Sequence, residues 1–185
     1  MTVNLDFDKL NSKYPKIKYG FTKELIQIGA NHPEILYDHF DQWEKMLKSD
    51  NNIFKWTAID IIGYLSAIDR NDKVDKDVDE LIALLHDGKL ITCNHAIFAL
   101  GRIAKNKPKH KTKIIKHLLS ISKDRFETAE CKNIATGKVL ETLKQFIPDI
   151  TDNKAAIDFI HRATENTRNA TKTKAIRLMK NIHKG

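Results

Sequence analysis

The chain has 185 residues, of which 41% are apolar, and it carries a formal net charge of +8. This length and composition suit a globular protein with a sizeable core and exclude a chain that is disordered throughout. No apolar run approaches the roughly 18 residues that a membrane span needs, and the first 16 residues contain no apolar signal core, so we expect a cytoplasmic protein that does not bind membranes, with Cys93 and Cys131 as reduced thiols.

Helical periodicity predicts an all-α fold, since the chain has only 7 Gly and 4 Pro and lacks strand-like alternation. Residues 1–16 are expected to form a loose leader or an N-terminal cap. Beyond them, two kinds of helical segment alternate. The first kind is predicted at 18–31, 53–68, 91–105, 128–146 and 169–183, and the second at 33–48, 74–87, 109–122 and 153–165. Prolines that can begin a helix but not continue one mark three of the breaks: Pro33, Pro108 and Pro148.

A repeat of about 40 residues underlies this alternation. The stretches FKWTAIDIIGYL at 54–65 and TCNHAIFALGRI at 92–103 align on an alanine, and both carry a glycine five residues later, Gly63 and Gly101. Four anchor alanines are spaced 38, 39 and 40 residues apart: Ala58, Ala96, Ala135 and Ala175. A fixed period of this size is typical of a helical repeat array. Small residues at matching places predict that a neighbouring helix passes close to each of them.

The pattern resembles the HEAT-repeat motif, in which a loop aspartate is followed by V-R-x-x-A-x-x-x-L-G. Residues 50–63 match it, and residues 87–101 match it except that Cys93 occupies the basic position. The resemblance covers nearly the whole chain beyond about residue 16. It implies one domain, 1–185, built as a right-handed, armadillo-like α-α superhelix of about four and a half helix pairs. Residues 169–183 would then be the C-terminal capping helix.

Charge is distributed unevenly along the chain. Residues 1–92 carry 12 Lys and Arg against 16 Asp and Glu, a net of −4, whereas residues 93–185 carry 20 against 8, a net of +12. The densest basic run, 102–117, contains Arg102, Lys105, Lys107, Lys109, Lys111, Lys113 and Lys116 and no acid. It covers the start of a second-kind helix, which would line the concave face of a HEAT array. We interpret it as an exposed surface for an anionic partner; an ordinary solvated face is the alternative.

Trp56 and Asp60 stand four residues apart and therefore project from one helical face. The stretch W-T-A-I-D resembles W-D-T-V-D of the HEAT-like alkylpurine DNA glycosylases, although Thr57 replaces an aspartate of that motif. This resemblance implies that Trp56 stacks on a damaged nucleotide and that Asp60 stabilises charge at the sugar. The alternative is an inter-repeat tryptophan beside an exposed aspartate.

Other catalytic signatures are missing from the sequence. It contains no phosphate-binding glycine loop, no GxSxG and no HExxH. The carboxylate-rich stretch 69–80 has Val74 where the tight turn of an EF-hand needs glycine, so we interpret it as an acidic helix start. The eight histidines are scattered. We therefore predict no metal site and no cofactor.

Taken together, these features predict a binding protein and not an enzyme. We expect a scaffold that holds a protein or peptide partner on a curved helical-repeat surface. The alternative is a nucleic-acid-binding protein that uses the basic C-terminal half, and a HEAT-like DNA repair glycosylase is the enzymatic form of that alternative. Backbone-directed nucleic-acid binding would weaken steeply with salt, which distinguishes the two.

Overall fold

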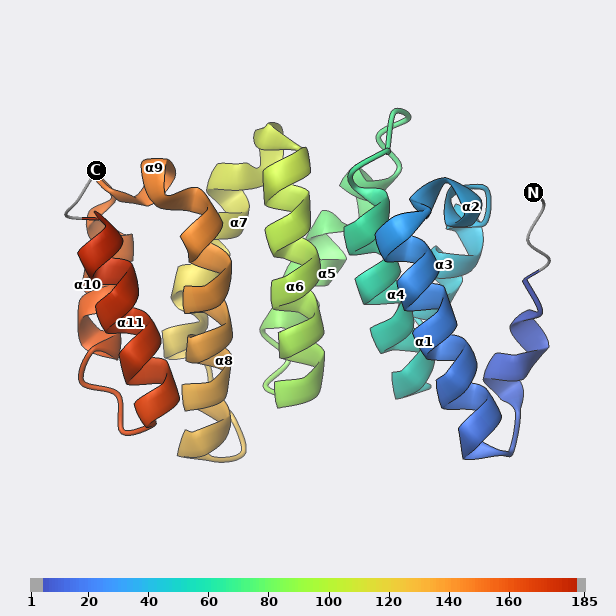
Figure 1. The fold of residues 1–185 in the computed structure, drawn as a ribbon, viewed down its shortest axis with the longest axis horizontal. Helices are drawn as coiled ribbons and strands as arrows, with labels where there is room; N and C mark the ends of the chain where they lie inside the picture. Colours follow the sequence, from blue (N-terminus) through green and yellow to red (C-terminus); the bar gives the residue numbers. More distant parts are fainter. Residues whose placement is uncertain (1–4, 183–185) are drawn as a thin grey trace. The chain divides into compact units, whose positions relative to one another are not determined.

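The computed structural model describes residues 5–182, and within them it contains helices and no strands (Figure 1). This confirms the all-α prediction. The chain divides into two compact units, Met1–Asp79 and Glu80–Gly185. The single domain over 1–185 and the right-handed superhelix stay predictions. Within residues 5–182, no helix is both long and apolar enough to cross a membrane.

The first unit contains six helical elements. They are the 3-10 helix η1 (Phe7–Asn11), the α-helices α1 (Pro15–Asn31), α2 (Pro33–Tyr37), α3 (Phe40–Leu47) and α4 (Asn52–Leu65), and the 3-10 helix η2 (Val74–Asp77). Helix α4 packs against α1, α2 and α3. The described part of the predicted leader, residues 5–16, packs on this unit, because Leu10 is buried and the Phe7 ring lies 5.4 Å from that of Trp43 and 6.4 Å from that of Phe21.

The second unit begins within helix α5 (Val78–Leu85) and continues to the end of the described chain. Its further elements are α6 (Leu90–Asn106), α7 (Pro108–Ser120), η3 (Ile121–Lys123), α8 (Ala129–Leu143), η4 (Lys144–Phe146), α9 (Ile147–Ile150), α10 (Lys154–Ala163) and α11 (Asn169–Ile182). Helices α6, α8 and α11 lie side by side in chain order (Figure 1). Helix α7 packs against α6, and α10 packs against α11 and α7.

Local sequence signals set the starts of these helices. Asn51, Thr128 and Asn153 are N-caps whose side-chain oxygens accept hydrogen bonds from the first turns of α4, α8 and α10. Pro33 and Pro108 occupy the first positions of α2 and α7, where a proline has no hydrogen bond to lose. The predicted segment 33–48 is instead two helices, α2 and α3. The indole of Trp43 donates to the Leu36 carbonyl over 2.9 Å at this break, which satisfies a carbonyl at the end of α2.

The repeat is visible in the packing of the first-kind helices. All four anchor alanines are fully buried: Ala58 in α4, Ala96 in α6, Ala135 in α8 and Ala175 in α11. A Cβ on Gly101 would lie 2.6 Å from Cγ2 of Thr142, so α8 does pass close to this glycine. A Cβ on Gly137 would lie 2.6 Å from the Thr171 hydroxyl of α11. Gly63 is buried, and its close helix neighbour stays a prediction.

Candidate functional site: a groove between α7 and α10

A hollow surface in the second unit lies between α7 and α10. We define the α7–α10 groove by three adjoining hollows that share lining residues. Its apolar floor comes from Ile115 and Leu119 of α7 and Ala155 of α10. Ile115 and Leu119 are buried because they recur on the inward face of the amphipathic α7. Lys111 and Lys116 of α7 line the groove beside these apolar side chains.

The first hollow has a volume of about 340 Å³ and lies where α7 faces α9 and the start of α10. It is lined by Lys111, Thr112, Ile115, Lys116, Leu119, Asp149, Asn153 and Ala155. Lys111 Nζ lies 2.5 Å from Asp149 Oδ1, and both side chains are about one-third exposed. Among the described residues that line the first hollow, this ion pair leaves Lys116 as the one uncommitted cation.

The second hollow has a volume of about 330 Å³ and shares Lys116, Leu119 and Ala155 with the first. Three cations line it: Lys116 of α7, Lys123 of η3 and Arg162 of α10. All three are exposed, and none forms an ion pair or side-chain hydrogen bond with any residue among 5–182. The acid in its lining, Asp158, is already bonded to Lys154 over 3.0 Å. The second hollow is therefore a concave, positively charged site.

The third hollow, of about 140 Å³, continues the groove towards α8. It shares Ser122 and Arg162 with the second, and it adds Phe159 and Asn166 to the lining. Its amides are engaged, since Asn166 Nδ2 donates to Asn133 Oδ1 over 2.9 Å. The groove thus changes from a basic, open middle to an end where polar side chains hold the protein's own elements together.

The residues of the predicted basic run are divided between α6, α7 and the corner that joins them, and the run as a binding surface stays a prediction. Lys111 and Lys116 line the groove, and Lys109 and Lys113 are exposed elsewhere on α7. Arg102 belongs to α6, where its guanidinium carbon lies 5.7 Å from the Phe98 ring centre, and Lys105 is exposed on the same helix. Lys107 was predicted to be exposed and this was wrong: it is only 7% exposed, because it sits at the tight corner that ends α6 and begins α7.

Sequence reasoning missed two of the three cations of the second hollow, Lys123 and Arg162. They lie outside the dense run 102–117, and only folding brings them beside Lys116. The sequence did contain a pattern that could have predicted Arg162. Arg162 lies on the same kind of helix as Lys116, one repeat later, and second-kind helices were expected to share one face. A comparison of charges on equivalent helices of successive repeats would have placed Lys116 and Arg162 on one surface. The density of charge along the sequence did not.

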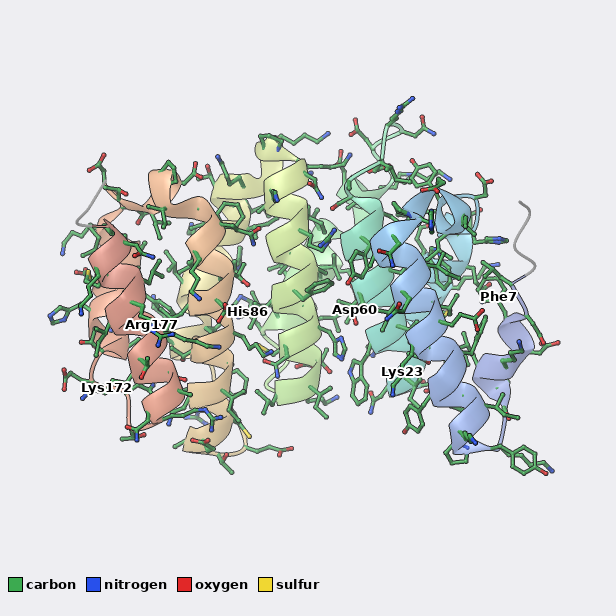
Figure 2. All side chains as sticks on the ribbon, in the orientation of Figure 1. Phe7, Lys23, Asp60, His86, Lys172 and Arg177 are labelled. Atoms are coloured by element: carbon green, nitrogen blue, oxygen red, sulfur yellow. The ribbon has the colours of Figure 1, made fainter. Side chains whose placement is uncertain are left out.

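Trp56 and Asp60 lie in the first unit on α4 and belong to no part of this groove (Figure 2 labels Asp60). Asp60 is only 8% exposed, and Trp56 is half-buried. A carboxylate that stabilises charge at a bound sugar has to reach the ligand. The low exposure of Asp60 therefore disfavours the glycosylase-like role, which stays a prediction.

Two histidines and an aspartate of the second unit form a hydrogen-bonded cluster that the sequence analysis did not predict. His86 Nδ1 lies 2.6 Å from Asp124 Oδ2, and His86 Nε2 lies 3.2 Å from His117 Nδ1. Lys132 Nζ donates to the Asp124 carbonyl over 3.2 Å. The 38-residue separation of His86 and Asp124 equals one repeat period, so the two loops occupy equivalent places in successive repeats.

Cys93 is buried, and its burial affects the protonation of the thiol. Burial, and after it the negative charges of Asp124 and Asp87, together raise the pKa of the Cys93 thiol to about 12. The thiol therefore stays protonated near neutral pH and is unsuited to act as a nucleophile. This agrees with its expected role as a buried, reduced side chain.

The carboxylates of Asp69, Asp72 and Asp75 approach one another within 4.8 Å in the loop of the first unit. Asp69 is engaged in holding that loop. Its Oδ1 accepts from the Tyr37 hydroxyl over 2.7 Å and from the Lys73 amide, and its Oδ2 accepts from the Val74 amide. This supports the interpretation of the acidic stretch as a helix start.

Comparison with known proteins places the chain in no family. No family matches it, and no curated protein matches it. Among solved structures, it is similar to an engineered protein whose crystal structure was a target of the Northeast Structural Genomics Consortium. The two share 17% identity and a TM-score of 0.57, over 96% of this chain and 77% of the engineered one. At this identity the likeness bears on the fold alone.

Proposed function

We propose that this protein is a non-enzymatic binding module that holds a segment of a protein or peptide partner in the α7–α10 groove. The observation that carries the proposal is the continuity of the three hollows, which combine an apolar floor with uncommitted cations. Clefts with an apolar base and a few polar groups are typical of ligand sites. The first two hollows together suit an extended chain with several side chains.

The proposal includes the HEAT-like architecture that the repeat implies, a right-handed superhelix with residues 169–183 as its C-terminal cap. Four equivalent, fully buried alanines support it, as does the close approach of α8 to Gly101. In such arrays the second helix of each unit lines the concave face, and α7 and α10 are such helices. We also propose a cytoplasmic location, which the free thiols of Cys93 and Cys131 support.

The test uses a displayed library of random peptides, with selected peptides measured by calorimetry. Ala155 is exposed at the junction of the two larger hollows, so Ala155→Trp fills the groove without entering the core. We expect it to weaken peptide binding by about tenfold or more. Ala170→Trp, at an exposed position of α11 outside the groove lining, is the matched control. Equal affinity of wild type and Ala155→Trp would overturn the proposal.

Nucleic-acid binding is the second candidate, favoured by the net charge of +12 in residues 93–185. The first and second hollows contain no aromatic side chain on which a base could stack, which favours the peptide. A duplex DNA probe titrated at increasing salt separates the two. Binding that falls steeply with salt and ignores Ala155→Trp would support the nucleic-acid candidate.

A further inference from the structure

We propose that the second hollow of the groove seats a phosphate monoester carried by the partner, such as a phosphoserine side chain, on Lys116, Lys123 and Arg162. This inference rests on the proposed function, since it names the chemistry of the segment that the groove holds. It turns the binding module into one whose partner is controlled by phosphorylation.

The second hollow has a net positive charge. Lys116, Lys123 and Arg162 come from three different elements, α7, η3 and α10, yet line the same hollow. Within residues 5–182 these cations have no acidic partner. Asp158 is held by Lys154. Three like charges at one concave surface repel each other, and a dianion between them would relieve that repulsion.

The second hollow offers a ligand hydrogen-bond donors from its cations and not from its hydroxyls. Two hydroxyls line the hollow, and both are committed: Ser120 donates to the His117 carbonyl over 2.8 Å, and Ser122 donates to the Leu119 carbonyl over 3.3 Å. The three cations are therefore the donors left for a ligand. A phosphate monoester offers three strong acceptor oxygens and nearly two negative charges. The Arg162 guanidinium can bond two of these oxygens at once, and lysines act as point charges.

The size of the groove favours a phosphopeptide over a free phosphate ion. A volume of about 330 Å³ is larger than one phosphate group, and the adjoining first hollow adds about 340 Å³ over Ile115 and Leu119. A phosphoserine in the second hollow would therefore leave room for apolar side chains of the same segment in the first. The paired Lys111 and Asp149 in that hollow add no net charge and do not attract a second phosphate.

The experiment measures fluorescence anisotropy with three degenerate peptide pools that differ only at the central residue: phosphoserine, serine or glutamate. At about 0.15 M salt, where long-range charge effects are screened, we expect the phosphoserine pool to bind about tenfold more tightly than the serine pool. Glutamate should fall between them, since it has one charge and two oxygens. A single-stranded DNA oligonucleotide serves as a further probe.

Two variants that each remove three positive charges test whether the preference for phosphoserine arises in the second hollow. The site variant Lys116→Gln, Lys123→Gln, Arg162→Gln should bind the phosphoserine and serine pools equally. The control variant Lys138→Gln, Lys180→Gln, Arg177→Gln removes the same charge from exposed positions on α8 and α11 (Figure 2 labels Arg177). It should keep the preference for phosphoserine. Circular dichroism confirms that both variants are folded.

Equal binding of the phosphoserine and serine pools to wild type would overturn the phosphate seat while leaving the groove as a peptide site. Equal losses in the site and control variants would also overturn it, because net charge alone would then explain the preference. Stronger binding of the oligonucleotide, lost in the site variant, would assign the hollow to nucleic acid and overturn the phosphopeptide. If no pool binds and the library selection also fails, the proposed function itself is wrong.

Discussion

Two places in the second unit carry many charged side chains: the α8–α11 junction and the α7–α10 groove. They differ in whether those side chains form ion pairs. Ion pairs form at and beside the α8–α11 junction. Arg168 bonds Glu130, and Lys174 lies 3.0 Å from Glu141, which also bonds Lys144 over 2.9 Å. In the α7–α10 groove, Lys116, Lys123 and Arg162 have no such partners within residues 5–182.

Backbone approach explains the difference. At the α8–α11 junction the helices are close enough that a Cβ on Gly137 would lie 2.6 Å from the Thr171 hydroxyl. Close helices bring side chains from both sides within bonding distance, so charges there stabilise the fold. Between α7 and α10 the surface is hollow, and the charges face solvent. Close helices thus favour ion pairs, and within the more open groove only Lys111 among the named cations of the described chain has one, with Asp149.

Gly137→Leu should have the largest effect on stability. The side chain would enter the space occupied by Thr171 and separate α8 from α11, which costs about 1–3 kcal/mol in the free energy of unfolding. Urea denaturation measures this. Gly20→Leu is the control, because a Cβ there meets nothing within 4 Å, and it should be neutral or slightly stabilising. A neutral Gly137→Leu would contradict the close approach.

Asn133→Ala should have the next largest effect. The Asn133 side chain donates to the Thr167 hydroxyl over 3.0 Å and accepts from Asn166 over 2.9 Å, which ties α8 to the loop before α11. Losing both bonds should cost about 1–2 kcal/mol in the free energy of unfolding. Asn181→Ala, at an exposed position on α11, should change it little. Similar values for the two variants would show that these bonds contribute nothing net.

The sequence predicted the positions of most helices well, because helical apolar spacing and prolines at breaks act within a few residues of the chain. It failed at Arg162 and at the His86–Asp124 pair, because Arg162 lies 46 residues from Lys116 and His86 lies 38 residues from Asp124. It missed Lys123 because that residue lies just beyond the dense run 102–117. It also failed at Lys107, whose burial depends on the tertiary corner between α6 and α7. The density of charged residues along the sequence does not show which of them lie on the same surface, because that depends on how the helices pack.

Glu141→Gln should have a smaller effect that depends on pH. The bonds from Lys144 and then Lys174 lower the pKa of Glu141. A lowered pKa in the folded state adds stability above the ordinary value of about 4.3, and this gain is lost as the pH falls through the lowered pKa. Glu141 is half exposed, so the gain should be no more than about 1 kcal/mol.

Wild type and Glu141→Gln should therefore differ in urea denaturation at about pH 7, and the difference should disappear as the pH falls through the lowered pKa of Glu141. Glu127→Gln, at an exposed position before α8, is the control and should show no such convergence. A difference between wild type and Glu141→Gln that is independent of pH would mean that packing, not charge, accounts for it.

The smallest effect is expected within the groove, where two lysines of one helix can be compared directly. Lys111 is paired with Asp149, so Lys111→Gln should cost about 0.2–1 kcal/mol in the free energy of unfolding, and less at high salt. Lys116 lies five residues further on and has no partner among residues 5–182. Lys116→Gln should leave stability within about 0.5 kcal/mol of wild type and can raise it by relieving repulsion from Lys123 and Arg162. The same substitution should weaken phosphopeptide binding, whereas Lys111→Gln should affect binding less. If Lys116→Gln proved the more destabilising of the two, Lys116 would have a structural role, and the contrast between paired and unpaired charges would not hold in this groove.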